Sequence, residues 1–193
     1  IVEASGVTLR NLEIQGDLLL AASIGEGEAA LDNVKVKGTV TVNGGGPNSI
    51  YFEDSEIDTL IVDKKNGAVR IVATGSTLVK RADLRSGAKL ESDASKDTGF
   101  GAVHLTKEMP SGSKIILLGE FAETNVASSN VELELTEGTI RELNVLSGAS
   151  GNTMSLNENT RVVDLTLEEE AKIRGPGVID RAVVGDRAKD STF

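Results

Sequence analysis

The residues with the clearest potential for chemistry lie in one glycine-rich corner, residues 43–49. Three consecutive glycines allow backbone conformations that other residues resist, and Pro47 fixes the φ angle directly before Asn48. An Asn-Ser bond held in a strained turn can be cut in two ways. The side-chain amide nitrogen of Asn48 can attack its own carbonyl carbon and form a succinimide, or the Ser49 hydroxyl can attack the Asn48 carbonyl and form an ester that water opens. The corner is therefore a candidate for self-cleavage.

Either cleavage reaction needs an acid or a base close to the bond. Glu53 and Asp54 follow after a short strand, and they are the predicted assisting residues. The alternative interpretation is a flexible turn between two structural units, with an Asn-Ser pair as inert as most others. If the chain is cut here, the units on either side should stay docked, because each contacts its neighbours along the stack.

Other catalytic arrangements receive little support from the sequence. The chain has 30 Asp and Glu residues, so some pair will match the spacing of a glycosidase or a calcium-dependent lyase by chance. The single histidine, His104, lies between two apolar residues of a predicted strand, which is more typical of a wall position than of a triad. No phosphate-binding loop, His-Glu-x-x-His motif or EF-hand frame occurs. We therefore predict no catalytic residues beyond the self-cleavage candidates, and a β-helical lyase or hydrolase is the least favoured reading.

Aromatic residues provide few platforms for stacking on sugar rings. Aromatic content is 3%, Trp is absent, and Tyr51 is the one plausible exposed ring, while Phe52 should point inward by alternation. Sugar recognition by this chain must therefore use Asp, Glu, Asn and Arg along a flat sheet, with or without calcium, and this predicts weak and broad affinity for polymers.

A repeat of 22 residues indicates which elements position these side chains. The apolar residues of 7–20 reappear at 29–42 (29 − 7 = 22), and those of 140–145 reappear at 162–167 (162 − 140 = 22). Each unit contains short strands with alternating apolar residues, separated by a polar or glycine corner. Such a strand buries one face only when another strand stacks on it, so the chain must coil upon itself.

Period, alternation and the shortage of helical patterns predict an all-β chain. We expect one right-handed parallel β-helix over residues 1–193, a pectate-lyase-like solenoid of about eight to nine coils. A Greek-key sandwich need not keep this phase, and the frame of leucine-rich repeats fails after the second unit. Asn11 and Asn33 should form a structural amide ladder at one corner. Ile1 begins within an apparent strand, so we expect a piece of a longer multidomain chain.

Composition excludes several classes of partner. The net charge of −10 and the pI near 4.7 argue against nucleic acid and against anionic membrane surfaces. No apolar run reaches the roughly 18 residues of a membrane span. Cysteine is absent, so the chain has neither disulfides nor a cysteine zinc site. We expect a monomer that is compatible with divalent cations and with neutral or cationic polymers.

Four stretches of the sequence resemble a known family. They are VTLRNL at 7–12, GDLLLA at 16–21, NGGGPNSI at 43–50 and GAVRIVA at 67–73. Together they resemble the family-54 carbohydrate-binding modules, β-helical modules of multimodular surface proteins in Gram-positive bacteria. Those modules lie between surface-layer anchors and polysaccharide-degrading domains such as chitinases and laminarinases.

The resemblance implies a function in binding rather than turnover. It suggests a secreted module at the bacterial cell surface that attaches a glycoside hydrolase to chitin, β-1,3-glucan or xylan, with Ca²⁺ as an implicated cofactor. It also strengthens the hypothesis of cleavage between Asn48 and Ser49, because self-cleavage at an Asn-Ser bond is associated with such modules. It assigns no sugar contacts and no calcium ligands. A structural spacer that binds no sugar is the competing interpretation.

Overall fold

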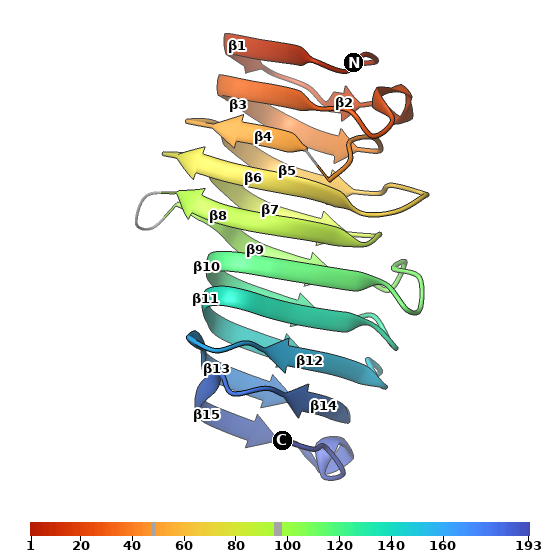
Figure 1. The fold of residues 1–193 in the computed structure, drawn as a ribbon, viewed down its shortest axis with the longest axis vertical. Helices are drawn as coiled ribbons and strands as arrows, with labels where there is room; N and C mark the ends of the chain where they lie inside the picture. The colour runs from red at the N-terminus through yellow and green to blue at the C-terminus, as the bar shows by residue number, and fades with distance from the viewer. Residues whose placement is uncertain (48, 95–97) are drawn as a thin grey trace.

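The computed structural model describes residues 1–47, 49–94 and 98–193, and these form a parallel β-solenoid of about eight turns (Figure 1). In this part of the chain, fifteen strands belong to a single hydrogen-bonded sheet system. The chain winds from the N-terminus at one end of the stack to the C-terminus at the other. The predicted all-β parallel helix is confirmed.

The strands and the two short 3-10 helices have these bounds: β1 (Val7–Ile14), β2 (Leu18–Leu20), η1 (Ala22–Ile24), β3 (Ala29–Val42), β4 (Ile50–Glu53), β5 (Glu56–Val62), β6 (Val69–Gly75), β7 (Leu78–Leu84), β8 (Ala88–Ala94), β9 (Gly99–Leu105), β10 (Lys114–Val126), β11 (Glu132–Val145), β12 (Asn152–Leu156), β13 (Thr160–Leu167), β14 (Ala171–Arg174), β15 (Val178–Val184) and η2 (Asp186–Ala188).

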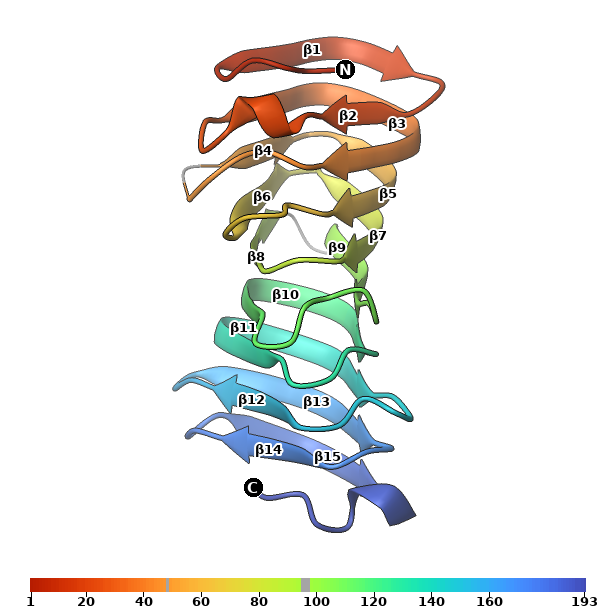
Figure 2. The ribbon, with the colours of Figure 1, turned by 90° about the vertical axis from the view of Figure 1, so that its right-hand side faces the viewer.

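Two walls enclose the core. Strands β4, β6, β8, β12 and β14 form the front wall, and β5, β7, β9, β13 and β15 form the back wall. The long strands β3, β10 and β11 bend and take part in both walls (Figure 1). The view turned by 90° shows the coils stacked along one axis, with η1 near the first coils and η2 after the last (Figure 2). None of the described helices is long or apolar enough to span a membrane.

Successive coils stack residue upon residue, as the 22-residue period requires. Leu9 pairs with Leu31, and Leu143 pairs with Leu165. The registers join one inner column of nine residues along the stack: Leu18, Val40, Leu60, Ala82, Val103, Thr124, Leu143, Leu165 and Ala182. Parallel pairing holds these side chains one strand spacing apart, about 4.8 Å, so aliphatic groups fill the interior without a second layer.

Two phenylalanines fill the middle of the stack. Phe100 and Phe121 lie in neighbouring coils with ring centroids 5.8 Å apart and planes inclined by 18°. On the front wall of the same coils, Ser92 and Gly119 pair in register. The two stacked rings thus form an aromatic contact between neighbouring coils inside the aliphatic core.

The corners are satisfied by side-chain ladders. Asn11 and Asn33 both have φ of 53°, and the Asn33 amide donates to Asn11 Oδ1 at 2.8 Å. This confirms the predicted asparagine ladder. At the following buried corner, Ser55 Oγ accepts from the backbone of Val34, and Thr77 Oγ1 accepts from the backbone of Ser55. These side-chain hydroxyl groups replace the backbone hydrogen bonds between strands that the bend interrupts.

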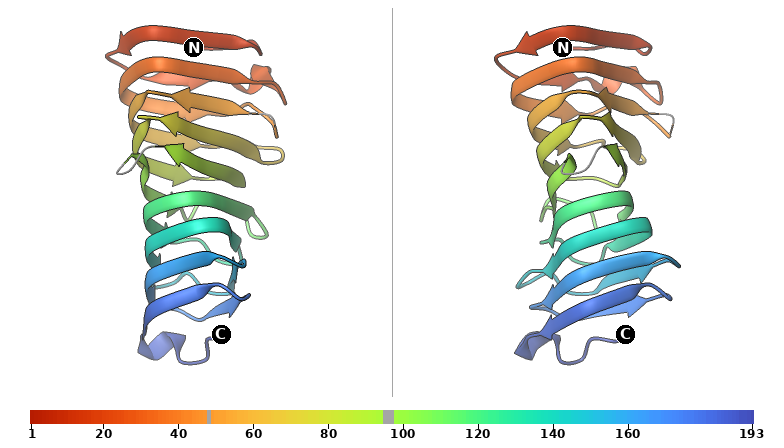
Figure 3. Two further views of the ribbon diagram at one scale, coloured as in Figure 1. Left: turned by 60° about the vertical axis from the view of Figure 1, so that its left-hand side comes forward. Right: turned by 90° about the vertical axis from the view of Figure 1, so that its left-hand side faces the viewer.

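The two end coils leave part of their apolar columns open, and Figure 3 shows both ends from the side. Leu12 in β1 is 38% exposed, and Val184 in β15, which stacks on Leu167, is 44% exposed. Each residue has a paired coil on one side only among the described residues. Burial therefore increases from the end coils toward the middle.

We expect Leu143→Ala to lower the free energy of unfolding by about 2–5 kcal/mol, because it opens a cavity inside a fully packed column. The same change at Leu12 should cost less than about 2 kcal/mol, because that side chain already contacts water. Urea denaturation followed by circular dichroism measures both. Equal losses at the two positions would contradict the stacked core.

Candidate functional site

The glycine-rich corner precedes β4, and its described part contains an unusual serine. Ser49 has φ of 104°, in the region that favours glycine, and its side chain is fully buried. Its Oγ has no hydrogen-bond partner among the described residues. Asn48 lies outside the described residues, so the site is described from Ser49 and from the residues before Asn48, without the Asn48–Ser49 peptide bond. A strained, buried and unpaired hydroxyl is nevertheless what an internal nucleophile would present.

The backbone before this serine is packed tightly against the preceding coil. Gly45 has φ of 99° and donates its N–H to the Gly25 carbonyl at 2.8 Å. A Cβ at Gly46 would lie 2.5 Å from the Glu26 carbonyl oxygen and 2.8 Å from Glu26 Oε2. Only glycine allows this approach, and the Glu26 carboxylate is thereby held beside the corner.

Lys64 approaches the same carboxylate from the following coil. Its Nζ lies 2.5 Å from Glu26 Oε1, and its side chain is only 7% exposed. Nζ also reaches the Ala68 carbonyl at 3.5 Å. Glu26 and Lys64 thus form an ion pair beside Gly46, which precedes Ser49 by three residues (49 − 46 = 3).

The structure does not bring the predicted assisting residues to the serine. Glu53 ends β4, which places it four residues from Ser49, about 13 Å along an extended strand. Asp54 lies at the next corner, where its carboxylate accepts hydrogen bonds from Ser76 N at 2.8 Å and Ser76 Oγ at 3.0 Å. The hydrogen bond from the Ser76 backbone N–H lowers the pKa of Asp54 most, and the bond from the Ser76 hydroxyl lowers it further, so the pKa lies below its usual value. The Asp54 carboxylate therefore stabilises the corner at which it lies, through its hydrogen bonds with Ser76.

Tyr51 is half-buried on the outside of the front wall. The Arg70 guanidinium carbon lies 5.9 Å from the centre of its ring, and Arg70 Nη1 donates to Tyr51 Oη at 3.5 Å. Arg70 also donates through Nε to Glu91 Oε1 at 2.8 Å and through Nη2 to Glu91 Oε2. A cation thus lies over the aromatic ring, and its role in sugar binding stays a prediction.

A second polar feature runs along the outside of the back wall. Glu123, Glu142 and Asp164 stack in three successive coils, and Asn125 and Asn144 stack beside them. We call these five residues the acid–amide strip. Asn125 Nδ2 donates to Glu123 Oε1 at 2.6 Å, and Asn144 Nδ2 donates to Asn125 Oδ1 at 3.0 Å. The strip is a row of hydrogen-bonding groups that repeats once per coil.

His104 extends this row by one coil, because it pairs with Asn125 in register. Its other neighbour in the column is Asp83, which Arg81 engages at 2.8 Å. The histidine is half-buried in the wall, as the sequence indicated.

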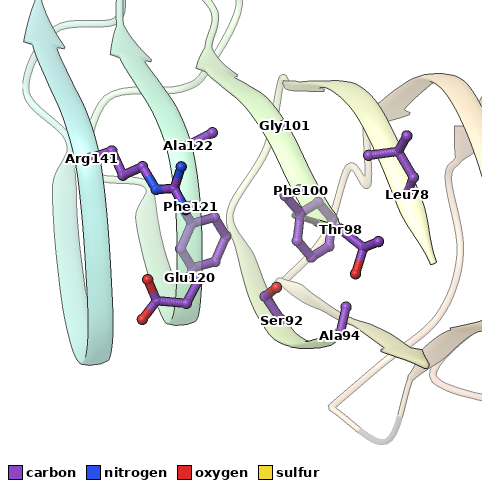
Figure 4. Close-up of a pocket in the computed structure, with 10 residues that line it drawn as sticks. All are labelled: Leu78, Ser92, Ala94, Thr98, Phe100, Gly101, Glu120, Phe121, Ala122 and Arg141. Atoms are coloured by element: carbon purple, nitrogen blue, oxygen red, sulfur yellow. The ribbon is translucent and has the colours of Figure 1, made fainter. Parts of the chain in front are cut away.

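The cavity in Figure 4 lies between β9 and β10, with a volume of about 510 Å³. Phe100 and Phe121 form part of its lining, and Glu120 and Arg141 border it from neighbouring strands. Both rings are only 1% exposed. They shape the floor of the cavity and offer no open face for stacking on a sugar.

Calcium ligands are not evident in the described ranges. Residues 1–47, 49–94 and 98–193 contain no group of three or more His, Cys, Asp and Glu side chains placed to hold a metal ion. Within the acid–amide strip, Asp164 is paired with Arg181 at 2.5 Å. Calcium dependence stays a prediction without assigned ligands.

Among solved structures, the chain is similar to chitinase ChiW from Paenibacillus sp. str. FPU-7, described as a bacterial cell-surface-expressed multi-modular enzyme. The identity is 36% and the TM-score is 0.72. The match covers 75% of this chain and 13% of that chain. No protein-family model matches the chain, and neither does any curated protein. The similarity supports a module of a multimodular cell-surface protein, while assignment to the family-54 carbohydrate-binding modules stays a prediction.

Sequence reasoning missed Glu26 and Lys64, although the period contained a signal for the first. Glu26 lies 20 residues before Gly46 (46 − 26 = 20), close to one period, so the repeat indicates that an acid of the preceding coil lies beside this corner. Lys64 is 38 residues from Glu26 and follows no simple multiple of the period. Its approach depends on how the turn at 63–68 folds back.

The Arg70–Glu91 pair should make stability depend on pH. The hydrogen bonds from Arg70, followed by a smaller contribution from Lys89, hold the pKa of Glu91 below its ordinary value of 4.5. A lowered folded-state pKa contributes stability above the ordinary value, which is lost as pH falls through the folded pKa. Glu91→Gln should therefore reduce the free energy of unfolding by about 1–3 kcal/mol at pH 7, and this difference should shrink as pH falls below 4.5. Urea titrations at several pH values provide the measurement.

Glu132→Gln is the matched control for that experiment. Its partner Lys114 lies 3.5 Å away, and both side chains are nearly half exposed. We expect an effect below about 1 kcal/mol at any pH. A Glu91→Gln penalty that is independent of pH would contradict the assignment.

Proposed function

We propose that the chain is a non-catalytic carbohydrate-binding module of a surface-anchored polysaccharide hydrolase, such as a chitinase. The observation that carries the proposal is the acid–amide strip on the outer face of the back wall. The similarity to part of a multi-modular cell-surface chitinase supports the setting.

The repeat geometry of the strip suits an extended polymer. Adjacent coils place like groups about 4.8 Å apart, which is comparable to the length of one pyranose unit. Glu123 and Glu142 have no ion-pair partner in the part of the chain that the structure describes, so their oxygens can accept hydrogen bonds from sugar hydroxyls. Asn144 Oδ1 offers a further acceptor one coil from Asn125. A chain of sugars lying along the helix axis would meet a carboxylate in each of three successive coils and an amide in two of them.

The strip should bind weakly at each sugar unit and more strongly to a polymer. A single hydrogen bond that replaces one to water contributes only about 0.5–1.5 kcal/mol. Several units bound together raise the apparent affinity, because each later contact is intramolecular. Binding to insoluble chitin, β-1,3-glucan or xylan is therefore expected to exceed binding to short oligosaccharides.

We expect the isolated chain to be retained on chitin, curdlan or xylan in a pull-down assay. The double substitution Glu142→Ala and Asn144→Ala should reduce retention by roughly tenfold, because it removes the middle of the strip. Repeating the assay with a chelator tests the predicted need for calcium, and Tyr51→Ala tests the predicted aromatic contact.

Glu137→Ala is the control, because Glu137 is an exposed acid on the same strand β11 but pairs in register with Leu118 at the other side of the bend. It should leave retention unchanged. Retention of the unmodified chain on none of the polymers would favour the alternative function of a structural spacer. Release of reducing sugar would instead favour a β-helical hydrolase or lyase.

A second proposed activity is self-cleavage between Asn48 and Ser49, which the burial and unpaired Oγ of Ser49 favour. In the ester route, Ser49 Oγ bonds to the Asn48 carbonyl carbon while the peptide C–N bond breaks, and the departing nitrogen takes up a proton as the new amine. Water then opens the ester and leaves a carboxylate on Asn48. In the succinimide route the Asn48 amide nitrogen attacks the same carbon and the same amine leaves. The Glu26–Lys64 ion pair, which lies beside Gly46, is the proposed acid–base pair.

Incubated protein should give two fragments, 1–48 and 49–193, on a denaturing gel and by mass spectrometry, while remaining one particle under native conditions. Ser49→Ala should abolish the ester route and preserve the succinimide route, and Asn48→Ala should do the reverse. Ser128→Ala is the matched control, since Ser128 is also buried with an unpaired Oγ among the described residues but follows Ala127. A single species with the full mass would refute self-cleavage.

A further inference from the structure

A gap in a row of side chains on the outside of the solenoid forms the cavity of Figure 4. The paired positions on either side place Lys80, Gly101, Ala122 and Arg141 in successive coils, beside the bend of β10. Two long side chains thus flank two coils that carry only a hydrogen atom or a methyl group. We call this space, of about 510 Å³, the bend cavity. Its volume falls within the range of small-molecule sites, roughly 300–1,000 Å³.

Backbone packing keeps this gap open. A Cβ atom at Gly101 would lie 2.7 Å from the Lys80 carbonyl oxygen of the preceding coil, so a side chain there would collide with the backbone. Ala122 is exposed, and Leu78 and Ala94, which also line the cavity, are half-buried. Their methyl groups form an apolar surface that a ligand can reach, unlike the two buried phenylalanine rings.

Two charged residues border this apolar surface. Among the described residues, Glu120 and Arg141 are the only charged side chains of the lining, and both are exposed. Lys80, next in the row, does not line the cavity, and its ammonium lies 2.9 Å from Glu56 Oε1. One carboxylate and one guanidinium balance in charge, so the bend cavity favours a neutral ligand over a metal ion or an anion.

The carboxylate, the guanidinium and the apolar surface together match an acetamido group. A carboxylate only accepts hydrogen bonds, and a guanidinium only donates them, through five N–H groups that a single partner cannot all use. An amide N–H can therefore donate to Glu120 while the amide carbonyl accepts from Arg141. The acetyl methyl group then rests on the methyl groups of Ala122 and Ala94. A hydroxyl group can exchange hydrogen bonds with the same charged side chains, but it leaves the apolar surface uncovered.

We infer that the bend cavity selects N-acetylated sugars, so that the module prefers chitin to β-1,3-glucan and xylan. The cavity adjoins the acid–amide strip, because Ala122 directly precedes Glu123 and Arg141 directly precedes Glu142. A chitin chain bound along the strip can thus extend an acetamido group into the cavity. The inference rests on the proposed carbohydrate-binding function, and it adds the residues that choose the polymer.

The test is an NMR titration of the full chain, with the methyl group of Ala122 as the reporter. Diacetylchitobiose, cellobiose and the disaccharide of glucosamine share their rings and their linkage, and they differ in carrying an acetamido, a hydroxyl or an amino group. Diacetylchitobiose should shift the Ala122 methyl resonance and bind about tenfold more tightly than the other two, because it alone buries a methyl group and presents an amide.

Substitutions in the lining test the same contacts. Ala122→Leu should weaken diacetylchitobiose binding about tenfold, read at the Ala94 methyl group, because the larger side chain fills the cavity. Arg141→Met should weaken binding several-fold, whereas Glu120→Gln keeps an acceptor and should retain most of the affinity. Ala22→Leu is the matched control, because Ala22 is also exposed but lies in η1, and it should leave the affinity unchanged. If Ala122→Leu does not fold, the comparison of the three disaccharides on the unmodified chain still decides.

The outcomes separate this inference from the proposed function. A selective shift by diacetylchitobiose, with stronger retention on chitin than on curdlan or xylan, would support both. Equal shifts by all three disaccharides, or no shift, together with retention on a polymer would overturn the selective cavity and leave the module function standing. A selective shift without polymer retention would support the cavity and overturn the function of the strip. The absence of both effects would overturn both proposals.

Discussion

The parallel register between successive coils is the constraint on which the rest of the structure depends. Each strand satisfies its backbone groups only by pairing with the coil before and after it, so every residue has a fixed neighbour about 4.8 Å above and below. Inside, this places Leu143 on Leu165 and fills the core with aliphatic columns. Outside, the same register stacks Glu142 on Asp164. Core packing and surface pattern are therefore two results of one backbone arrangement.

The register also explains where chemistry can arise. On the flat walls, side chains occur in rows, which suits repeated weak contacts with an extended partner. At the corners, the chain must turn within a few residues, and coils of different turn length pack on one another. There the close approach of Gly46 to Glu26 and the burial of Lys64 become possible. Strained backbone and buried polar groups thus occur at the turns, while extended rows of accessible side chains occur on the walls.

Much of the fold was predictable, because the 22-residue period fixes which residues stack, as the Asn11–Asn33 ladder illustrates. The candidate site was predictable only in part. Ser49 was identified from its neighbours in sequence, but Glu53 was chosen because it is close along the chain, and an extended strand carries it away. Tyr51 was expected to be an open ring, yet Arg70 from the next coil lies over it. Sequence distance is a poor guide to contacts between coils.

The sequence by itself determined the repeat, the inward-facing columns and the acidic, cysteine-free character of the surface, because periodicity and composition act on every residue alike. Tertiary structure alone decided which polar side chains meet at the turns. Lys64 reaches Glu26 across 38 residues, and Asn43 lines a cavity together with both of them. These contacts depend on the exact path of irregular turns, whose backbone lacks the repeating hydrogen bonds that make strands predictable.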